Sequence, residues 1–374
     1  MAEDYESVSY YWVYLDENST FPTYEYPVQT NSIAITIVIA VISFLALSAN
    51  CIVIYIVVSF RSMHTVTNFY ILNLAVCDLL FIIVCAPSIS VIYALPDWIM
   101  GEFMCKLNAY VQHVSVQASC TTLTMMTLDR LYVIQCPLTS RFKRTTGRVS
   151  MVVAMIWIVS LLLHIPPAMY YKVEILRWHY QADTKSCQPS FPSEEFDKGY
   201  TIYSIIMTYV IPLVVITVCY VLILKLLWSL RQFKPEDEAL SDGQSQTAST
   251  VAQKWRATRM VLTVVLLFGV CWAPIHIFNL WMIFDQTSSA IKAHIRVFCS
   301  CLIYAHAFFN PVIYALVGAS FRQCFKELLF GRRTICKCVT FGKKARIRLA
   351  RTYSTVYHKT SKRRPDSPTA STLI

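Results

Sequence analysis

One carboxylate, that of Asp78, stands in the middle of a long apolar stretch of this chain. A charged side chain at bilayer depth costs about 2.5–3.5 kcal/mol on insertion scales, so we expect it to have a partner. Three polar residues of other apolar stretches can reach it, Asn50, Ser119 and Asn310. Carboxylate and hydroxyl oxygens are hard ligands, so Asp78, Ser119 and Asn310 are candidates for a sodium site. The alternative is a hydrogen-bonded helix-packing network without an ion.

A second charged group, Asp129-Arg130, closes the third apolar stretch. An acid beside an arginine at a membrane boundary can be an ordinary interfacial pair. Here the pair is followed by residues 132–138, Tyr-Val-Ile-Gln-Cys-Pro-Leu, and then by a basic segment. That longer series is much more specific than the pair alone.

Proline interrupts two of the apolar stretches next to aromatic residues. Phe268 precedes Cys271-Trp272-Ala273-Pro274, and the last stretch is broken by Asn310-Pro311-Val312-Ile313-Tyr314. Proline removes a helical hydrogen bond and bends the chain. Trp272 beside Pro274 is either core packing or a lever whose small shifts the bend amplifies.

Seven apolar stretches of about twenty or more residues must position these groups, because each matches the thickness of a bilayer. They cover residues 33–60, 68–93, 105–133, 149–171, 200–228, 259–284 and 297–317. Hydrophobic residues make up 56% of the chain and charged residues 15%, unlike a soluble protein. We predict an all-α membrane protein, a seven-transmembrane helix bundle followed by a short amphipathic cytoplasmic helix near residues 321–329.

Charge asymmetry predicts the orientation and three regions. Residues 1–32 carry six acidic and no basic side chains, whereas residues 140–148 and 318–374 are rich in lysine and arginine. The positive-inside rule then places the amino terminus outside and the carboxyl terminus inside. We predict an acidic extracellular tail (1–32), a seven-helix receptor domain with its juxtamembrane helix (33–330), and a basic, Ser/Thr-rich cytoplasmic tail (331–374). The net charge of +11 is therefore a lipid-facing cytoplasmic excess and does not favour nucleic-acid binding.

The two tails carry candidate modification sites. Asn18-Ser19-Thr20 is a glycosylation acceptor on the predicted outer side. The tyrosines beside it suit either a solvated disordered tail or a docking or sulfation site for a basic ligand. Inside, Ser and Thr residues of the carboxyl tail can accept phosphate from receptor kinases and recruit arrestin, and Thr372-Leu373-Ile374 fits a PDZ domain.

Of fourteen cysteines, twelve fall inside predicted spans or on the predicted cytoplasmic side. Only Cys105 and Cys187 stand where oxidation is expected, so we predict a disulfide between them. Cysteines that follow the seventh span near basic residues are candidates for palmitoylation, and these are Cys324, Cys336 and Cys338. A zinc site is disfavoured because no matching Cys or His pair accompanies them.

These residues together resemble the rhodopsin-like (class A) family of G-protein-coupled receptors over roughly residues 33–330. The matching residues are Asn50, Asn73 to Asp78, Trp98 to Gly101, Cys105, Asp129-Arg130, Trp157, Pro212, Tyr220, Cys271 to Pro274, Asn310 to Tyr314 and Phe321-Arg322. The resemblance implies that Asp129 restrains Arg130 at rest. It also implies that, on activation, the sixth helix swings out and Arg130, Tyr220 and Tyr314 line a cavity for a heterotrimeric G protein. Leu131 departs from the usual tyrosine.

Shorter strings look most like kisspeptin receptors, within a group that includes galanin and allatostatin-A receptors. They are 65–70, 93–98, 103–106, 114–120, 191–193 and 265–268. This resemblance implies a neuropeptide ligand of the amidated Arg-Phe type and coupling to Gq, phospholipase C and calcium. A galanin or allatostatin-A type receptor coupled to Gi is the alternative.

Single residues narrow the ligand class. Gln112 stands where amine receptors place an aspartate, and the seventh span lacks the lysine of an opsin. Candidates for a peptide pocket, chosen for polarity or aromaticity, are Tyr93, Gln112, His276, Asn279, Trp281, Arg296 and Tyr304. Acidic outer residues would steer a basic peptide.

A channel or ion-coupled transporter also explains seven spans and a central carboxylate, but the internal repeats of transporters are absent. The scattered histidines and only eight glycines offer no catalytic constellation, so we do not expect an enzyme, a catalytic residue or a cofactor beyond the sodium ion.

Overall fold

The structure is a computed structural model that describes residues 32–95, 97–176, 184–232, 241–285 and 290–330. Its long helices are α1 (Ser32–Ser59), α2 (Val66–Ala94), α3 (Gly101–Gln135), α5 (Thr146–Leu163), α8 (Ile211–Gln232), α9 (Ser241–Phe284) and α10 (Ala290–Val317). The shorter ones are η1 (Arg61–Met63), α4 (Pro137–Lys143), α6 (Ile165–Tyr170), α7 (Glu194–Ile205), η2 (Ile206–Val210) and α11 (Ala319–Phe330).

The seven predicted spans are confirmed as helices. The fourth is α5 plus α6, interrupted at His164 just before Pro166-Pro167, and the fifth is the continuous series α7, η2 and α8. Among the described residues, six of these helical stretches are long and apolar enough to cross a bilayer. The seventh, α3, is more polar because it packs against α2, α5, α6, α8 and α9, so few of its side chains need to face lipid.

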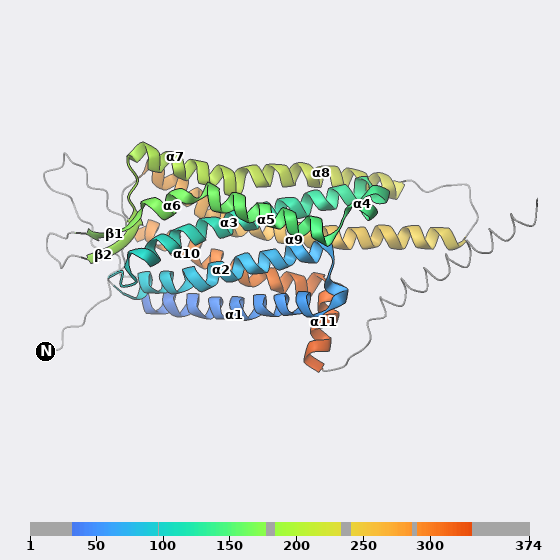
Figure 1. Cartoon of the computed structure of the whole chain (residues 1–374), viewed down its shortest axis with the longest axis horizontal. Helices are drawn as coiled ribbons and strands as arrows, with labels where there is room; N and C mark the ends of the chain where they lie inside the picture. Colours follow the sequence, from blue (N-terminus) through green and yellow to red (C-terminus); the bar gives the residue numbers. More distant parts are fainter. Residues whose placement is uncertain (1–31, 96, 177–183, 233–240, 286–289, 331–374) are drawn as a thin grey trace, which may run out of the picture. The chain divides into compact units, whose positions relative to one another are not determined.

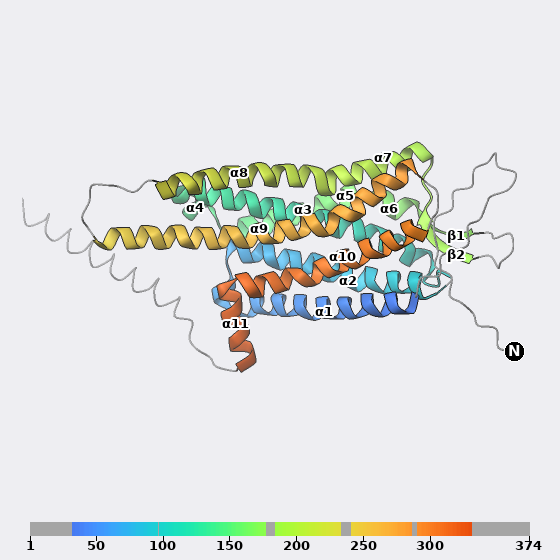
Figure 2. The ribbon, with the colours of Figure 1, turned by 180° about the vertical axis from the view of Figure 1, so that it is seen from behind.

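Within the compact unit that ends at Phe325, the long helices lie side by side (Figures 1 and 2). α1 contacts α2 and α10, α2 contacts α3, α3 contacts α8, and α10 contacts α9. We call the end of this bundle that carries β1 and β2 the hairpin end, and the opposite end, where α3 meets α4, the Arg130 end (Figure 1). Large buried side chains such as Tyr314, Phe268 and Leu74 fill the space between the helices.

An antiparallel hairpin, β1 (Tyr171–Leu176) with β2 (Thr184–Pro189), lies in the segment expected only as a long loop. The predicted disulfide between Cys105 and Cys187 is present and ties β2 to the start of α3. The Asp97 carboxylate accepts a hydrogen bond from the backbone N–H of Lys185 at 2.7 Å. The backbone N–H of Trp98 donates to the carbonyl of Lys185 at 2.8 Å. The hairpin is thus fixed covalently and by hydrogen bonds.

The expected juxtamembrane helix is α11, whose first turns pack inward. Phe321 and Cys324, three residues apart, are buried, and the Phe321 ring lies 5.8 Å from that of Tyr314. Cys324 is only 1% exposed, which argues against a lipid chain on its thiol in this arrangement. The other predicted modification sites, Asn18, Cys336 and Cys338, lie outside the described residues, as do the two tails.

Candidate functional site

The seven pocket candidates come from four helices that meet toward the hairpin end. Tyr93 lies on α2, Gln112 on α3, His276, Asn279 and Trp281 on α9, and Arg296 and Tyr304 on α10. The Tyr93 hydroxyl lies 3.4 Å from Ser300 Oγ and so joins α2 to α10. Tyr304 is buried and packs on the ring of Phe81, with centroids 5.0 Å apart. Tyr304 therefore forms part of the floor of the candidate pocket. Gln112 and Asn279 are only half-buried and so are more open to a ligand.

Two cations of α10 lie over two aromatic rings of α9. Lys292 Nζ is 5.1 Å from the centre of the Trp281 ring, and the Arg296 guanidinium is 5.5 Å from that of Phe278. Lys292 also pairs with the Asp285 carboxylate at 2.8 Å. Trp281 and Arg296, expected as ligand contacts, thus also hold the ends of α9 and α10 together.

A buried polar cluster beside these residues was not predicted. The ring of His164 lies between the Tyr200 hydroxyl, 3.0 Å from Nδ1, and the Gln117 side-chain oxygen, 3.3 Å from Nε2. The His113 ring is 5.6 Å from the His164 ring and 5.9 Å from the Tyr200 ring. The members of this cluster are far apart in the sequence and belong to no recognised motif, so sequence reasoning did not find them.

Tyr171, the first residue of β1, lies near Tyr200 at the hairpin end, and we call this place the mouth of the pocket. Burial and the nearby Asp197 raise the pKa of its hydroxyl to about 12, although Arg296 acts in the opposite direction. The hydroxyl therefore stays protonated at neutral pH and is available as a donor. Asp197 on α7 and Arg296 on α10 give the mouth both an acidic and a basic side.

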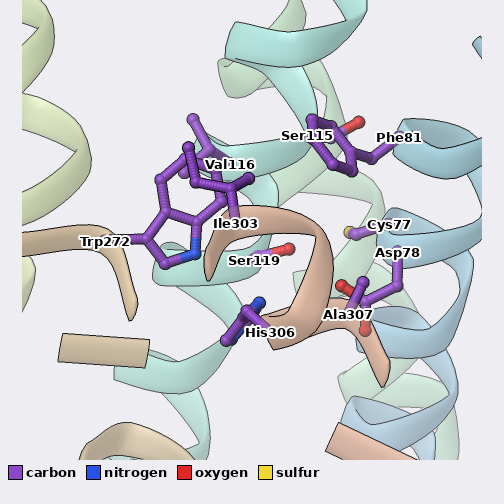
Figure 3. A pocket seen from close by; sticks show the side chains of 10 residues that line it. All are labelled: Cys77, Asp78, Phe81, Ser115, Val116, Ser119, Trp272, Ile303, His306 and Ala307. Atoms are coloured by element: carbon purple, nitrogen blue, oxygen red, sulfur yellow. The ribbon is translucent and has the colours of Figure 1, made fainter. Parts of the chain in front are cut away.

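A small cavity lies beside Asp78 (Figure 3). It leaves about 10 Å³ for the centres of water-sized atoms, which is room for roughly one water molecule or small ion. Figure 3 shows Asp78, Ser119 and His306 pointing toward this space, with Trp272 on its wall. His306 was not predicted; its Nε2 atom is buried without a hydrogen-bond partner among the described residues.

The three sodium-site candidates are only partly assembled around the cavity. Asp78 and Ser119 line it, while the Asn310 amide N–H donates to Asp78 Oδ2 at 3.0 Å. Asn50, also expected to reach Asp78, donates instead to the carbonyls of Ala46 and Ala307, each at 2.9 Å. Its donors are thereby used. The carboxylate and hydroxyl oxygens that remain suit a hard cation.

An aromatic column runs along α9 next to the cavity. The Trp272 ring stacks on Phe268 at 5.8 Å and on His276 at 6.1 Å, and it meets His306 of α10 edge-on at 6.2 Å. Tyr209 packs on His276 at 4.7 Å. Aromatic rings thus connect His276, a pocket candidate, to the cavity without a gap. Trp272 and His276 each stand two residues from Pro274, which lies inside α9.

At the Arg130 end the expected pairing of Asp129 with Arg130 differs in the structure. Both oxygens of the Asp129 carboxylate are 2.6 Å from nitrogens of Arg144. Arg130 instead donates from Nη2 to the hydroxyl of Thr67. Asp129 pairs with Arg144 because the Arg144 guanidinium donates two parallel hydrogen bonds to the carboxylate, a geometry that is stronger than a single bond.

Two further switch residues are tyrosines. Tyr220, on α8, is buried next to Arg130, and Tyr314, on α10, is fully buried and follows Pro311, a proline inside that helix. The Tyr314 hydroxyl has no hydrogen-bond partner in the described part of the chain, and that of Tyr220 makes none of normal geometry. Both can accept new partners if α9 and α10 move.

Comparison with known proteins agrees with this arrangement. The family model "7 transmembrane receptor (rhodopsin family)" matches residues 49–314. The chain is 35% identical over 309 residues to "G-protein coupled receptor 54" of Oreochromis niloticus, covering 81% of this chain and 80% of that relative. It is 34% identical over 305 residues to the "KiSS-1 receptor" of Homo sapiens (80% and 73%) and 30% identical over 267 residues to "Galanin receptor type 1" of Rattus norvegicus (71% and 72%).

The matched residues span all seven helices and include Asp78, Arg130, Trp272 and Asn310. The transporter and enzyme alternatives are thereby set aside. The chain belongs to the rhodopsin family of seven-transmembrane receptors, multi-pass membrane proteins that signal and are not enzymes.

Proposed function

We propose that this receptor binds an extracellular peptide of the kisspeptin type, ending in an amidated Arg-Phe, and signals through Gq, phospholipase C and calcium. The observation that carries the ligand class is the similarity to the KiSS-1 receptor of Homo sapiens, at 34% identity against 30% for the galanin receptor quoted above. A galanin or allatostatin-A type receptor coupled to Gi is the second candidate, supported by that same galanin match.

The hairpin end supports a peptide ligand. Glu194, Glu195 and Asp197 lie in the first turn of α7, and Asp197 acts electrostatically on Tyr171 at the mouth. Acidic groups there would attract a basic peptide and raise its rate of association. The unpartnered nitrogens of His276, at the top of the aromatic column, offer the peptide a polar contact deeper in the bundle. In this proposal the hairpin end is extracellular, the Arg130 end is cytoplasmic and Asp78 can hold sodium.

The tails extend the proposal. Asn18 would be glycosylated outside, and Cys336 or Cys338 would carry palmitate inside, in preference to the buried Cys324. Receptor kinases and arrestin would act on the Ser/Thr-rich tail, and its last three residues would bind a PDZ protein.

The test is a ligand screen in cells that express the receptor. Amidated Arg-Phe peptides and galanin-like peptides are compared, with intracellular calcium and cyclic AMP as readouts. We expect a calcium response to the amidated Arg-Phe peptides only. The matched control is each peptide with a free carboxylate instead of the amide. A response to galanin-like peptides alone, or a fall in cyclic AMP without calcium, would favour the second candidate.

A further inference from the structure

Two arginines and one carboxylate meet at the Arg130 end, and the carboxylate is taken by the arginine outside α3. Arg144 Nε lies 2.6 Å from Asp129 Oδ1, and Arg144 Nη2 lies 2.6 Å from Asp129 Oδ2. The Asp129 side chain is only 9% exposed and that of Arg144 is 24% exposed. The pair is therefore largely shielded from water and salt, unlike a surface ion pair.

Thr67, in the first turn of α2, connects the two arginines. Its hydroxyl accepts hydrogen bonds from Arg144 Nη2, at 3.2 Å, and from Arg130 Nη2. Arg130 Nε is buried and has no hydrogen-bond partner among the described residues. The hydroxyl of Thr67, a neutral group, thus orients Arg130. The guanidinium of Arg130 still interacts electrostatically with Asp129 and Tyr220.

Arg144 is held in a fixed place by the backbone around it. Its N–H caps the end of α4 by donating to the carbonyl of Ser140 at 3.0 Å. The next residue, Thr145, caps the start of α5 by accepting from the N–H of Arg148. A guanidinium that starts from a residue between two capped helix ends loses little freedom when it binds Asp129.

We propose that Arg144 is a positioning residue for Arg130: by occupying Asp129, it keeps Arg130 turned toward Thr67 and free for the G protein. The inference rests on the proposed coupling to a G protein. A largely buried carboxylate does not stay unpaired. Without Arg144, the cation that already interacts with Asp129 is Arg130. Arg130 would then turn to Asp129, and the resting arrangement would be favoured.

The experiment measures ligand-independent nucleotide exchange on purified G proteins of the Gq and Gi classes by purified receptor. The variants are Arg144→Met and Arg144→Lys, each also made in an Asp129→Asn background. Arg148→Met is the matched control, because that exposed arginine bonds the Lys143 carbonyl and not Asp129. Far-ultraviolet circular dichroism and thermal unfolding check that each variant is folded.

We expect Arg144→Met to lower basal exchange about fivefold or more. Arg144→Lys should lower it less, because lysine keeps the charge but cannot form the two parallel hydrogen bonds. Arg148→Met should match wild type. In the Asp129→Asn background, Arg144→Met should have no further effect, since Arg130 then has no carboxylate to turn to. An unchanged or raised basal exchange in Arg144→Met overturns the inference. So does an equal loss in the Asp129→Asn background.

Failure of the proposed function gives a different result. A wild-type receptor that promotes no exchange on any G protein refutes the coupling itself. Thermal unfolding of the same four proteins, wild type, the two single variants and the double variant, then still tests the pair, because additive effects of Arg144→Met and Asp129→Asn would show that the two side chains are not coupled.

Discussion

The polar side chains on the two sides of the bundle are treated differently. On the side of α2, α3 and α5, which we call the frame, Asn73 donates to Thr122 at 2.7 Å and accepts from the Trp157 indole at 2.8 Å. On the α9–α10 side, the Trp272 indole N–H and the Tyr314 hydroxyl are buried without hydrogen-bond partners among the described residues. Pro274, which follows Trp272, and Pro311, which precedes Tyr314, also lie on that side.

We infer from this difference that α9 and α10 can shift against each other more easily than the helices of the frame can move. Moving a helix of the frame would break hydrogen bonds that each contribute about 1 kcal/mol and would leave buried groups unpaired, at about 1–3 kcal/mol each. A shift of α9 against α10 breaks few such bonds and gives unpaired groups a chance to find partners. A receptor that must adopt two packings needs one side of each kind.

The largest expected effect comes from detaching the hairpin from the frame. Replacing Cys105 and Cys187 together by serine removes a cross-link between residues 82 positions apart. We expect a loss of about 4 kcal/mol, since the loop it closes is long. Thermal unfolding of the purified receptor measures it, with Cys51→Ser, at an exposed free cysteine, as the control. Equal unfolding temperatures for the double variant and the control would show that hydrogen bonds alone hold the hairpin.

A somewhat smaller loss should follow from breaking the frame at its centre. Asn73→Leu leaves the Trp157 N–H without its acceptor and Thr122 without its donor, so we expect destabilisation by about 2–3 kcal/mol. Thr217→Val is the control, because that exposed hydroxyl bonds only the Leu213 carbonyl of its own helix. If both variants unfold at the wild-type temperature, the frame is no more rigid than the other side.

On the α9–α10 side the same kind of change should have the opposite sign. The buried Nε2 atom of His306 has no hydrogen-bond partner among the described residues. His306→Leu replaces this ring with an apolar side chain of similar size. We therefore expect stability to rise by about 1 kcal/mol, with a weaker response to agonist because one packing is favoured. Thermal unfolding and a calcium dose-response curve are measured together. Destabilisation as large as that of Asn73→Leu would contradict the comparison.

The smallest effect is expected where the α9–α10 side does have partners. Lys292→Met removes the ion pair with Asp285, the hydrogen bond to its carbonyl and the contact with the Trp281 ring. We expect a loss of about 1 kcal/mol, because the Asp285 carboxylate that remains is 39% exposed and is solvated by water. Lys198→Met, in an exposed pair with Glu194, is the control and should cost less. A loss above 2 kcal/mol at Lys292 would mean that the hairpin end of this side is as rigid as the frame.

Sequence reasoning predicted the helices, the disulfide and the contact of Asn310 with Asp78, but not the other polar pairs between helices. Apolar runs of bilayer length identify spans without ambiguity, and Cys105 and Cys187 were the two cysteines expected in an oxidising place. The partner of Asp129 was different because Arg144 reaches it across a turn whose shape no pattern encodes. His306 and His164 were missed because spans that are apolar on every face carry little periodicity, so the rotation of each helix stays undetermined.

The π turn η2 at Ile206–Val210 has a consequence for anyone who compares this receptor with relatives. Such a turn holds one more residue than an α-helical turn, and one residue corresponds to about 100° around the axis. In a relative without it, an ungapped alignment through α7 and α8 would pair Tyr200 with a position on a different face. Residue correspondences for the fifth span should therefore be made separately on each side of Ile206–Val210.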